Sequence, residues 1–188
     1  MPRPSRREHL IKTAMELFAE HGYHATGVDL IMATAGVSKK TLYTYFRSKD
    51  ELILACLENY ADKFRDNFMA QVEQAAETPR DRLLAIFDIA ETWFCQADFY
   101  GCVFINACGE FSEKDSRIRE VSREFKRLLL SYFEHLCRQL PVSDPDELAR
   151  ELALLQEGAI VTAQVSGNSA SARTARRAAV TLLEAAIA

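Results

Sequence analysis

Glycine and proline are scarce in this sequence, which holds only 7 Gly and 5 Pro among its 188 residues. Chains that stay disordered are rich in such residues and poor in apolar ones, so a disordered chain is excluded. Hydrophobic residues make up 48% of the chain, enough for a sizeable core at this length. The composition therefore predicts a compact, mainly helical protein of one or two domains.

Long apolar runs are absent as well. No segment approaches the roughly 20 apolar residues that a membrane helix needs, and the basic start of the chain is not followed by the apolar part of a signal peptide. The 5 cysteines are an odd number without the spacing of a small disulfide-rich domain. We therefore expect a cytoplasmic protein that has no membrane partner.

The sequence also lacks the signatures of enzymes. It has no glycine-rich phosphate loop, no G-x-S-x-G elbow, no H-E-x-x-H pair and no carboxylate pair set against a nucleophile. His21 and His24 are spaced like a metal pair, but no third ligand is near them in the sequence. We predict that the protein is not an enzyme and holds neither a metal nor a cofactor.

The formal net charge of −4 hides an uneven distribution. Residues 1–49 hold eight Lys and Arg against four acids, giving +4, whereas residues 50–188 hold 15 against 23, giving −8. A cationic end on an acidic body suits a protein that presents one face to phosphate. The basic segment Pro2–Arg7 either reaches DNA or is a solvated tail.

The stretch Gly22–Leu52 carries the strongest local signals. Its Ala-Gly-Val sequence around Gly36 predicts a tight turn between two short helices, because glycine supplies an unhindered backbone. Ser38 is the expected N-cap of the second helix, which should span roughly residues 39–47. Leu42 and Phe46 are four residues apart and should face a core.

The opposite face of that helix carries cations, hydroxyls and phenols. Its members recur at helical spacing, with two more at the start: Lys40, Tyr43, Thr44 and Arg47, then Lys39 and Thr41. A helix in a DNA major groove needs such a face. We interpret the stretch as a helix-turn-helix whose second helix reads DNA.

The segment GVSKKTLYTYFRSKDEL, residues 36–52, resembles the DNA-binding signature of the TetR/AcrR family of bacterial transcription regulators. The resemblance runs from about Ser5 to Leu57 and continues only as helix pattern and total length. It implies an all-α homodimer with a DNA-binding domain at residues 1–49 and an effector-binding and dimerisation domain at residues 50–188. Asp29, Met32 and Lys40 depart from the family's usual residues, which bears on base preference.

The predicted DNA-binding residues form two groups. Those expected at base edges or adjacent phosphates are Lys39, Lys40, Thr41 and Tyr43. Those expected to position the domain on the phosphate backbone are Thr26, Tyr45 and Lys49, and the resemblance supplies the roles of Thr26 and Lys49. Thr26 is also a candidate cap for the helix that follows it. Lys49 begins a long helix, where a lysine is unfavourable unless a phosphate approaches.

Cap signals and apolar spacing predict about nine helices in all. The first runs from a Ser5–Glu8 capping box to about His21, and a similar box, Ser48 with Glu51, begins a long helix to about Glu77. Later helices are expected at about 79–97, within 101–111, and at 115–140, 145–166 and 171–187.

The last two of these helices are rich in alanine. Small side chains let helices approach closely, and the resemblance implies that the matching helices of two subunits form a four-helix bundle. Packing within one chain is the alternative. Because a single helix-turn-helix seldom binds tightly and paired half-sites supply affinity, we predict a homodimer through the last two helices.

The resemblance also implies a small-molecule effector site in the C-terminal part. Aromatic residues concentrate between residues 87 and 111, and the long helix after them adds more. The candidates are Trp93, Phe94, Phe104, Phe111 and Tyr132. A pocket of this kind suits a small organic inducer, although each aromatic taken singly also suits plain core.

We therefore predict a repressor that binds a palindromic double-stranded DNA operator and is released by an unknown small-molecule effector. A thiol-based redox regulator of the same fold is an alternative that Cys95, Cys102 and Cys108 leave open. Their spacing fits no zinc site, and no cation is evident to lower a thiol pKa. A non-specific DNA-binding structural protein is a third possibility, but it would not need a large aromatic-rich second domain.

Overall fold

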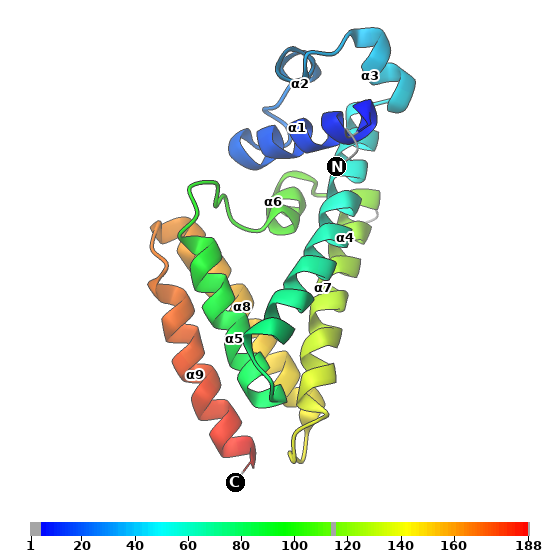
Figure 1. The fold of residues 1–188 in the computed structure, drawn as a ribbon. Coiled ribbons are helices and arrows are strands. Elements are labelled where there is room, and N and C mark those ends of the chain that lie inside the picture. The colour runs from blue at the N-terminus through cyan, green and yellow to red at the C-terminus, as the bar shows by residue number, and fades with distance from the viewer. Residues whose placement is uncertain (1–4, 114–115, 188) are drawn as a thin grey trace. The chain divides into compact units, whose positions relative to one another are not determined.

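The computed structural model describes residues 5–113 and 116–187, and in these ranges it contains nine α-helices and no strand (Figure 1). The helices are α1 (Arg6–His21), α2 (Val28–Ala35), α3 (Lys39–Tyr45), α4 (Lys49–Ala75), α5 (Pro79–Phe94), α6 (Val103–Glu110), α7 (Arg117–Cys137), α8 (Pro145–Ser166) and α9 (Ala170–Ile187). The all-α prediction is confirmed. The start of the basic arm, residues 2–4, and the helix start expected near Asp115 lie outside the described residues.

The chain packs as two compact units. Unit 1 comprises the described residues up to Phe64 together with Val103–Arg123, and so includes α1 to α3, the first part of α4, α6 and the start of α7. Unit 2 comprises Arg65–Cys102 and the described residues from Glu124 onward. The predicted division into a DNA-binding domain at residues 1–49 and an effector-binding and dimerisation domain at residues 50–188 stays a prediction. Packing adds that α6, expected near an effector pocket, belongs to the unit that carries the helix-turn-helix.

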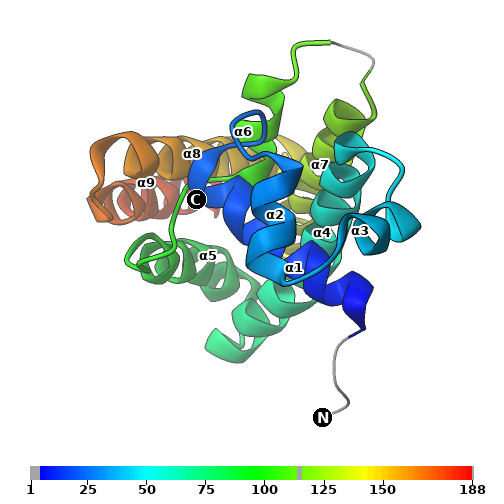
Figure 2. The ribbon, with the colours of Figure 1, turned by 90° about the horizontal axis from the view of Figure 1, so that it is seen from above.

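The start of unit 1 follows the local sequence signals. The Ser5–Glu8 capping box is present: the Glu8 N–H donates to Ser5 Oγ at 3.2 Å and the Ser5 N–H to Glu8 Oε2 at 2.7 Å. Gly22 ends α1 with a φ of 88°. The two helices α1 and α2 pack together, and Figure 2 shows α2 lying across α1.

The turn of the helix-turn-helix is built as expected. Gly36 ends α2 in the left-handed region, with φ 63° and ψ 35°, which a residue without a side chain adopts at little cost. Ser38 caps α3, since its Oγ accepts the Thr41 N–H at 3.2 Å. The box expected at the start of α4 differs by one residue: the Glu51 N–H donates to Ser48 Oγ, but the Glu51 carboxylate accepts the Arg47 N–H.

Unit 2 is built on α5, α8 and α9, and α8 and α9 lie antiparallel and side by side (Figure 1). Proline follows the N-cap residue at the start of two helices, after Thr78 in α5 and after Asp144 in α8. The core of unit 2 combines large and small apolar side chains, among them Leu83, Ile86, Phe87, Phe133, Leu136, Ala149, Leu152, Ala179 and Leu183. Some of the small residues of α8 and α9 therefore pack inside the core of this chain.

Candidate nucleic-acid interface

The two faces of α3 differ in exposure as the sequence predicts. Leu42 is fully buried and Phe46, the C-cap residue, is 2% exposed. Lys39, Lys40 and Tyr43 are exposed, the tyrosine by 43%. The helix therefore presents cations and a phenol to solvent while two apolar side chains anchor it to the core.

A cation from α1 adds to this anchoring. The Arg7 guanidinium lies 5.3 Å from the centre of the Phe46 ring, an interaction of about 0.5–1 kcal/mol at an exposed site. His9 Nε2 also lies 3.1 Å from the Ala35 carbonyl at the end of α2. Arg7, predicted in a basic arm, is instead part of α1 and packs against Phe46 at the end of α3.

Two of the residues predicted at the phosphate backbone are accessible. Tyr45 is 37% exposed. Lys49 is half-buried at the start of α4, and its Nζ donates to the His24 carbonyl at 3.1 Å. An ammonium has three N–H donors, so this bond leaves two for a phosphate. The helix N-terminus beneath it attracts an anion as well.

Thr26 does not fit the two roles predicted for its side chain. It is fully buried, and its hydroxyl donates to the Gly22 carbonyl at 2.6 Å or to the Leu17 carbonyl at 3.2 Å. It does not cap α2 either, because the N-cap residue is Gly27, which has no side-chain cap. The spacing of Thr26 and Asp29 resembles a helix cap, but the Thr26 side chain is buried and its hydroxyl bonds to carbonyls of the preceding segment.

An acidic residue that no local sequence pattern indicated holds the turn between α1 and α2. The Glu110 carboxylate, at the end of α6, accepts the Tyr23 N–H at 2.7 Å and the His24 N–H at 2.6 Å. Its Oε2 also lies 2.9 Å from His24 Nδ1. Partial burial acts to raise the pKa of Glu110, but the bonds from His24 and Tyr23 outweigh it and lower the pKa. The carboxylate is therefore charged at neutral pH.

The five predicted effector residues divide between the two units. Trp93 and Phe94 lie in unit 2, where both contact Phe99 with ring centres 4.9 Å apart. Phe104 and Phe111 lie in unit 1. Phe104 contacts Tyr60, and Phe111 stacks on His24 with ring centres 4.8 Å apart.

The fifth of these residues, Tyr132, is 6% exposed in unit 2, and its ring lies edge-on to Phe68. Among the described residues no group forms a hydrogen bond with its buried hydroxyl. Burial raises the pKa of Tyr132, and the charge of Glu73 adds to the effect while Arg82 opposes it. A buried hydroxyl without a partner costs about 1–3 kcal/mol, so it calls for an explanation.

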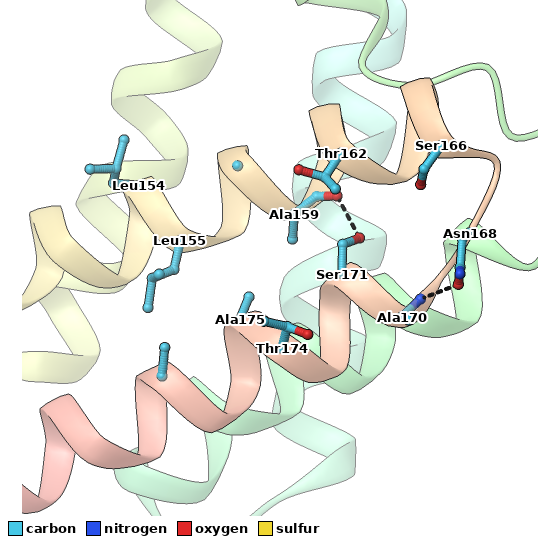
Figure 3. A pocket seen from close by; sticks show the side chains of 12 residues that line it. Leu154, Leu155, Ala159, Thr162, Ser166, Asn168, Ala170, Ser171, Thr174 and Ala175 are labelled. Atoms are coloured by element: carbon cyan, nitrogen blue, oxygen red, sulfur yellow. Dashed lines mark hydrogen bonds between the residues drawn. The ribbon is translucent and has the colours of Figure 1, made fainter.

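A groove of about 460 Å³ runs between α8 and α9 (Figure 3). Its walls are mostly small side chains, and the lining residues include Leu154, Leu155, Gly158, Ala159, Thr162, Thr174, Ala175 and Ala178. The hydroxyl of Ser171 in α9 donates to the Ala159 carbonyl in α8 at 2.8 Å, and both residues line the groove. Beside the groove α8 carries an exposed apolar stripe, with Leu154 72%, Val161 41% and Val165 84% exposed.

The cysteines show one contact that the sequence did not indicate. Lys126 Nζ lies 3.4 Å from the Sγ of buried Cys102, so a cation does stand beside one thiol, contrary to expectation. The same ammonium forms an ion pair with both oxygens of Glu157, at 2.6 and 2.7 Å, which offsets its charge. Burial raises the pKa of Cys56 and of Cys137 to about 12, and Cys95 is exposed.

No helix in the described part of the chain combines the length and the apolar character that crossing a bilayer requires. Within residues 5–113 and 116–187, no three or more His, Cys, Asp and Glu side chains are grouped so that they could hold a metal ion.

Two family models match the chain. Residues 10–56 match the model of bacterial regulatory proteins of the tetR family, and residues 79–179 match the tetracyclin repressor-like C-terminal domain. The first match covers α2, α3 and most of α1, and the second covers α5 to α8 and part of α9.

Individual relatives agree with these matches. The transcriptional regulator AcuR of Cereibacter sphaeroides is 30% identical over 83% of this chain and 75% of its own length. The transcriptional activator FasR of Mycolicibacterium smegmatis is 42% identical over 50% of this chain, which spans 41% of that protein. The crystal structure of a TetR-family transcriptional regulator from Streptomyces coelicolor superposes with a TM-score of 0.87, at 26% identity, over 97% of this chain and 96% of that one.

Proposed function

The chain belongs to the TetR family of bacterial regulatory proteins and is a DNA-binding regulator of transcription, and we propose that it acts as a homodimeric repressor which a small molecule releases from a palindromic operator. The proposed location is the cytoplasm, where such a regulator meets its DNA. Members of this family are regulators and generally not enzymes.

The observation that carries the proposal is the exposed face of α3 on a fully anchored helix. Leu42 and Phe46 fix the helix from one side, so Lys40 and Tyr43 project into solvent at defined positions. We propose that Lys39, Lys40, Thr41 and Tyr43 meet base edges and adjacent phosphates. We assign Tyr45 and Lys49 to the phosphate backbone, where contacts add affinity without sequence preference.

The proposed partner of the α8–α9 groove is a second copy of this chain. The exposed stripe of Leu154, Val161 and Val165 flanks the groove. Leaving such an apolar stripe exposed to water is unfavourable, so a partner that covers it is expected. Two copies packed there form a four-helix bundle. In such a twofold dimer the two α3 helices must lie one DNA turn, about 34–36 Å, or a multiple of it apart to engage successive half-sites.

The effector acts in this proposal by favouring a dimer whose α3 helices have the wrong separation. Its leverage is limited to its difference in affinity for the two conformations. We propose that the Tyr132 hydroxyl is one polar contact for the effector, because it is buried and has no hydrogen-bond partner among the described residues.

Replacing Tyr132 with phenylalanine is expected to have two opposite effects. The unliganded protein should gain about 1 kcal/mol in its free energy of unfolding, because a buried hydroxyl without a partner is removed. Small organic compounds that raise the melting temperature of the wild type should raise that of the variant less. Chemical denaturation and a thermal-shift screen measure the two effects, and Tyr45→Phe, whose residue is exposed, is the matched control. A loss of stability in Tyr132→Phe would contradict the assignment.

Selection of bound sequences from random duplexes tests the proposed function as a whole. A homodimeric helix-turn-helix regulator should recover a twofold-symmetric site whose half-sites lie one helical turn, or a multiple of it, apart. Recovery of a single asymmetric site, or of no preferred sequence, would overturn the proposal. The second outcome would favour the non-specific DNA-binding alternative.

A further inference from the structure

The turn between α1 and α2 is held from α6 at three points. The Tyr23 hydroxyl donates to the Val103 carbonyl at 3.0 Å, at the start of α6. The Glu110 carboxylate accepts the N–H groups of Tyr23 and His24, at the end of α6. The Phe111 ring then stacks on the His24 ring. Two consecutive N–H groups on one carboxylate are an anion site built by the backbone itself.

The His24 residue connects this carboxylate to Lys49. Its N–H donates to Glu110 Oε2 at 2.6 Å, and its carbonyl accepts the Lys49 Nζ at 3.1 Å. A change in the position of the turn therefore moves the carbonyl that orients the ammonium. Bonds to charged groups are the stronger ones in proteins, so both links resist displacement.

The backbone at Gly22 permits the close approach of the carboxylate. Gly22 has a φ of +88°, which side-chain-bearing residues rarely adopt, and a Cβ there would lie 3.0 Å from Glu110 Oε1. The turn is thus shaped around the acid by its glycine as well as by its N–H groups.

We propose that Glu110 is a positioning residue for DNA binding, which fixes the α1–α2 turn so that the His24 carbonyl holds the Lys49 ammonium in place for a phosphate. The inference rests on the phosphate role proposed above for Lys49. It places one determinant of DNA affinity on α6, outside the helix-turn-helix.

The sign of the expected effect separates positioning from simple electrostatics. Removing an acid from a DNA-binding unit should strengthen DNA binding, because it removes a negative charge that repels the phosphates. Removing Glu110 should weaken binding if its task is to position Lys49. Glu113 lies three residues further on and is exposed, so Glu113→Ala removes the same charge without removing the contacts to the turn.

The experiment measures the affinity for a short duplex of arbitrary sequence as a function of salt, because phosphate contacts do not depend on sequence. The full-length proteins compared are the wild type, Lys49→Ala, Glu110→Ala, the double variant and the control Glu113→Ala. Melting temperatures are recorded for all five. Glu110→Gln, which keeps one acceptor oxygen and the shape of the side chain, is measured in case Glu110→Ala does not fold.

We expect Lys49→Ala to reduce the slope of log affinity against log salt by about one for each bound subunit. Glu110→Ala should reduce it comparably, and the double variant should lose little beyond Lys49→Ala alone, because the two residues act as one unit. Glu113→Ala should bind as tightly as the wild type or more tightly.

The possible failures are distinguishable. A wild-type slope in Glu110→Ala, or additive losses in the double variant, overturns the positioning role while leaving the phosphate role of Lys49 intact. A wild-type slope in Lys49→Ala overturns the phosphate role itself, and the inference with it.

Discussion

Replacing Val165 with glutamate is expected to convert the protein to a monomer and to weaken operator binding by about two to four orders of magnitude. Val165 is 84% exposed on the apolar stripe of α8, so the substitution costs little within one chain. In the proposed dimer it would place a charge from each subunit in an apolar interface, where an unpaired charge is costly. Losing the link between two half-site contacts removes about a 10²- to 10⁴-fold gain in avidity.

Light scattering during gel filtration gives the mass of the variant, and fluorescence anisotropy with the selected operator gives its affinity. Ser131→Glu is a suitable control, because Ser131 is exposed on α7 and the substitution introduces the same charge on a helix other than α8 and α9. A Val165→Glu protein that remains dimeric would show that the subunits meet through another surface.

Tyr43→Ala is expected to weaken operator binding by roughly 1–3 kcal/mol for each half-site, or about 5- to 150-fold, while leaving non-specific binding unchanged. Tyr43 is 43% exposed on α3, so its ring is available for a base edge, whereas the buried Leu42 beside it keeps the helix in place. The measurement compares the selected operator with a scrambled duplex at one salt concentration.

Tyr45→Ala is the matched comparison, because it removes the same ring from the same helix. Tyr45 is 37% exposed and is assigned to the phosphate backbone, so its loss should weaken both duplexes alike. Equal losses of operator and scrambled binding in Tyr43→Ala would place that ring on phosphate or sugar and not on a base.

The features that the sequence predicted well depend on neighbours in the chain. The Ser5–Glu8 box, the left-handed Gly36 and the Ser38 cap each involve residues within three or four positions of one another. The burial of Leu42 and Phe46 follows from helical spacing once the helix is given.

The features that the sequence missed depend on distant residues. Tyr23 and Glu110 are 87 positions apart, and no spacing rule connects them. The same is true of Lys126 and Glu157, which are 31 positions apart and bring a cation to Cys102. Thr26 looked like a surface cap, but packing turned its hydroxyl inward.

The helices, most of their caps and the residues that α3 exposes could therefore be predicted from the sequence, because hydrogen bonds and side-chain spacing within a helix are local. Packing between helices places α6 with the helix-turn-helix, holds the turn beside Lys49 through Glu110, and divides the predicted effector aromatics between two units. Contacts of this kind form between helices that are distant in the sequence, and the residue spacing along one helix does not show which other helix packs against it.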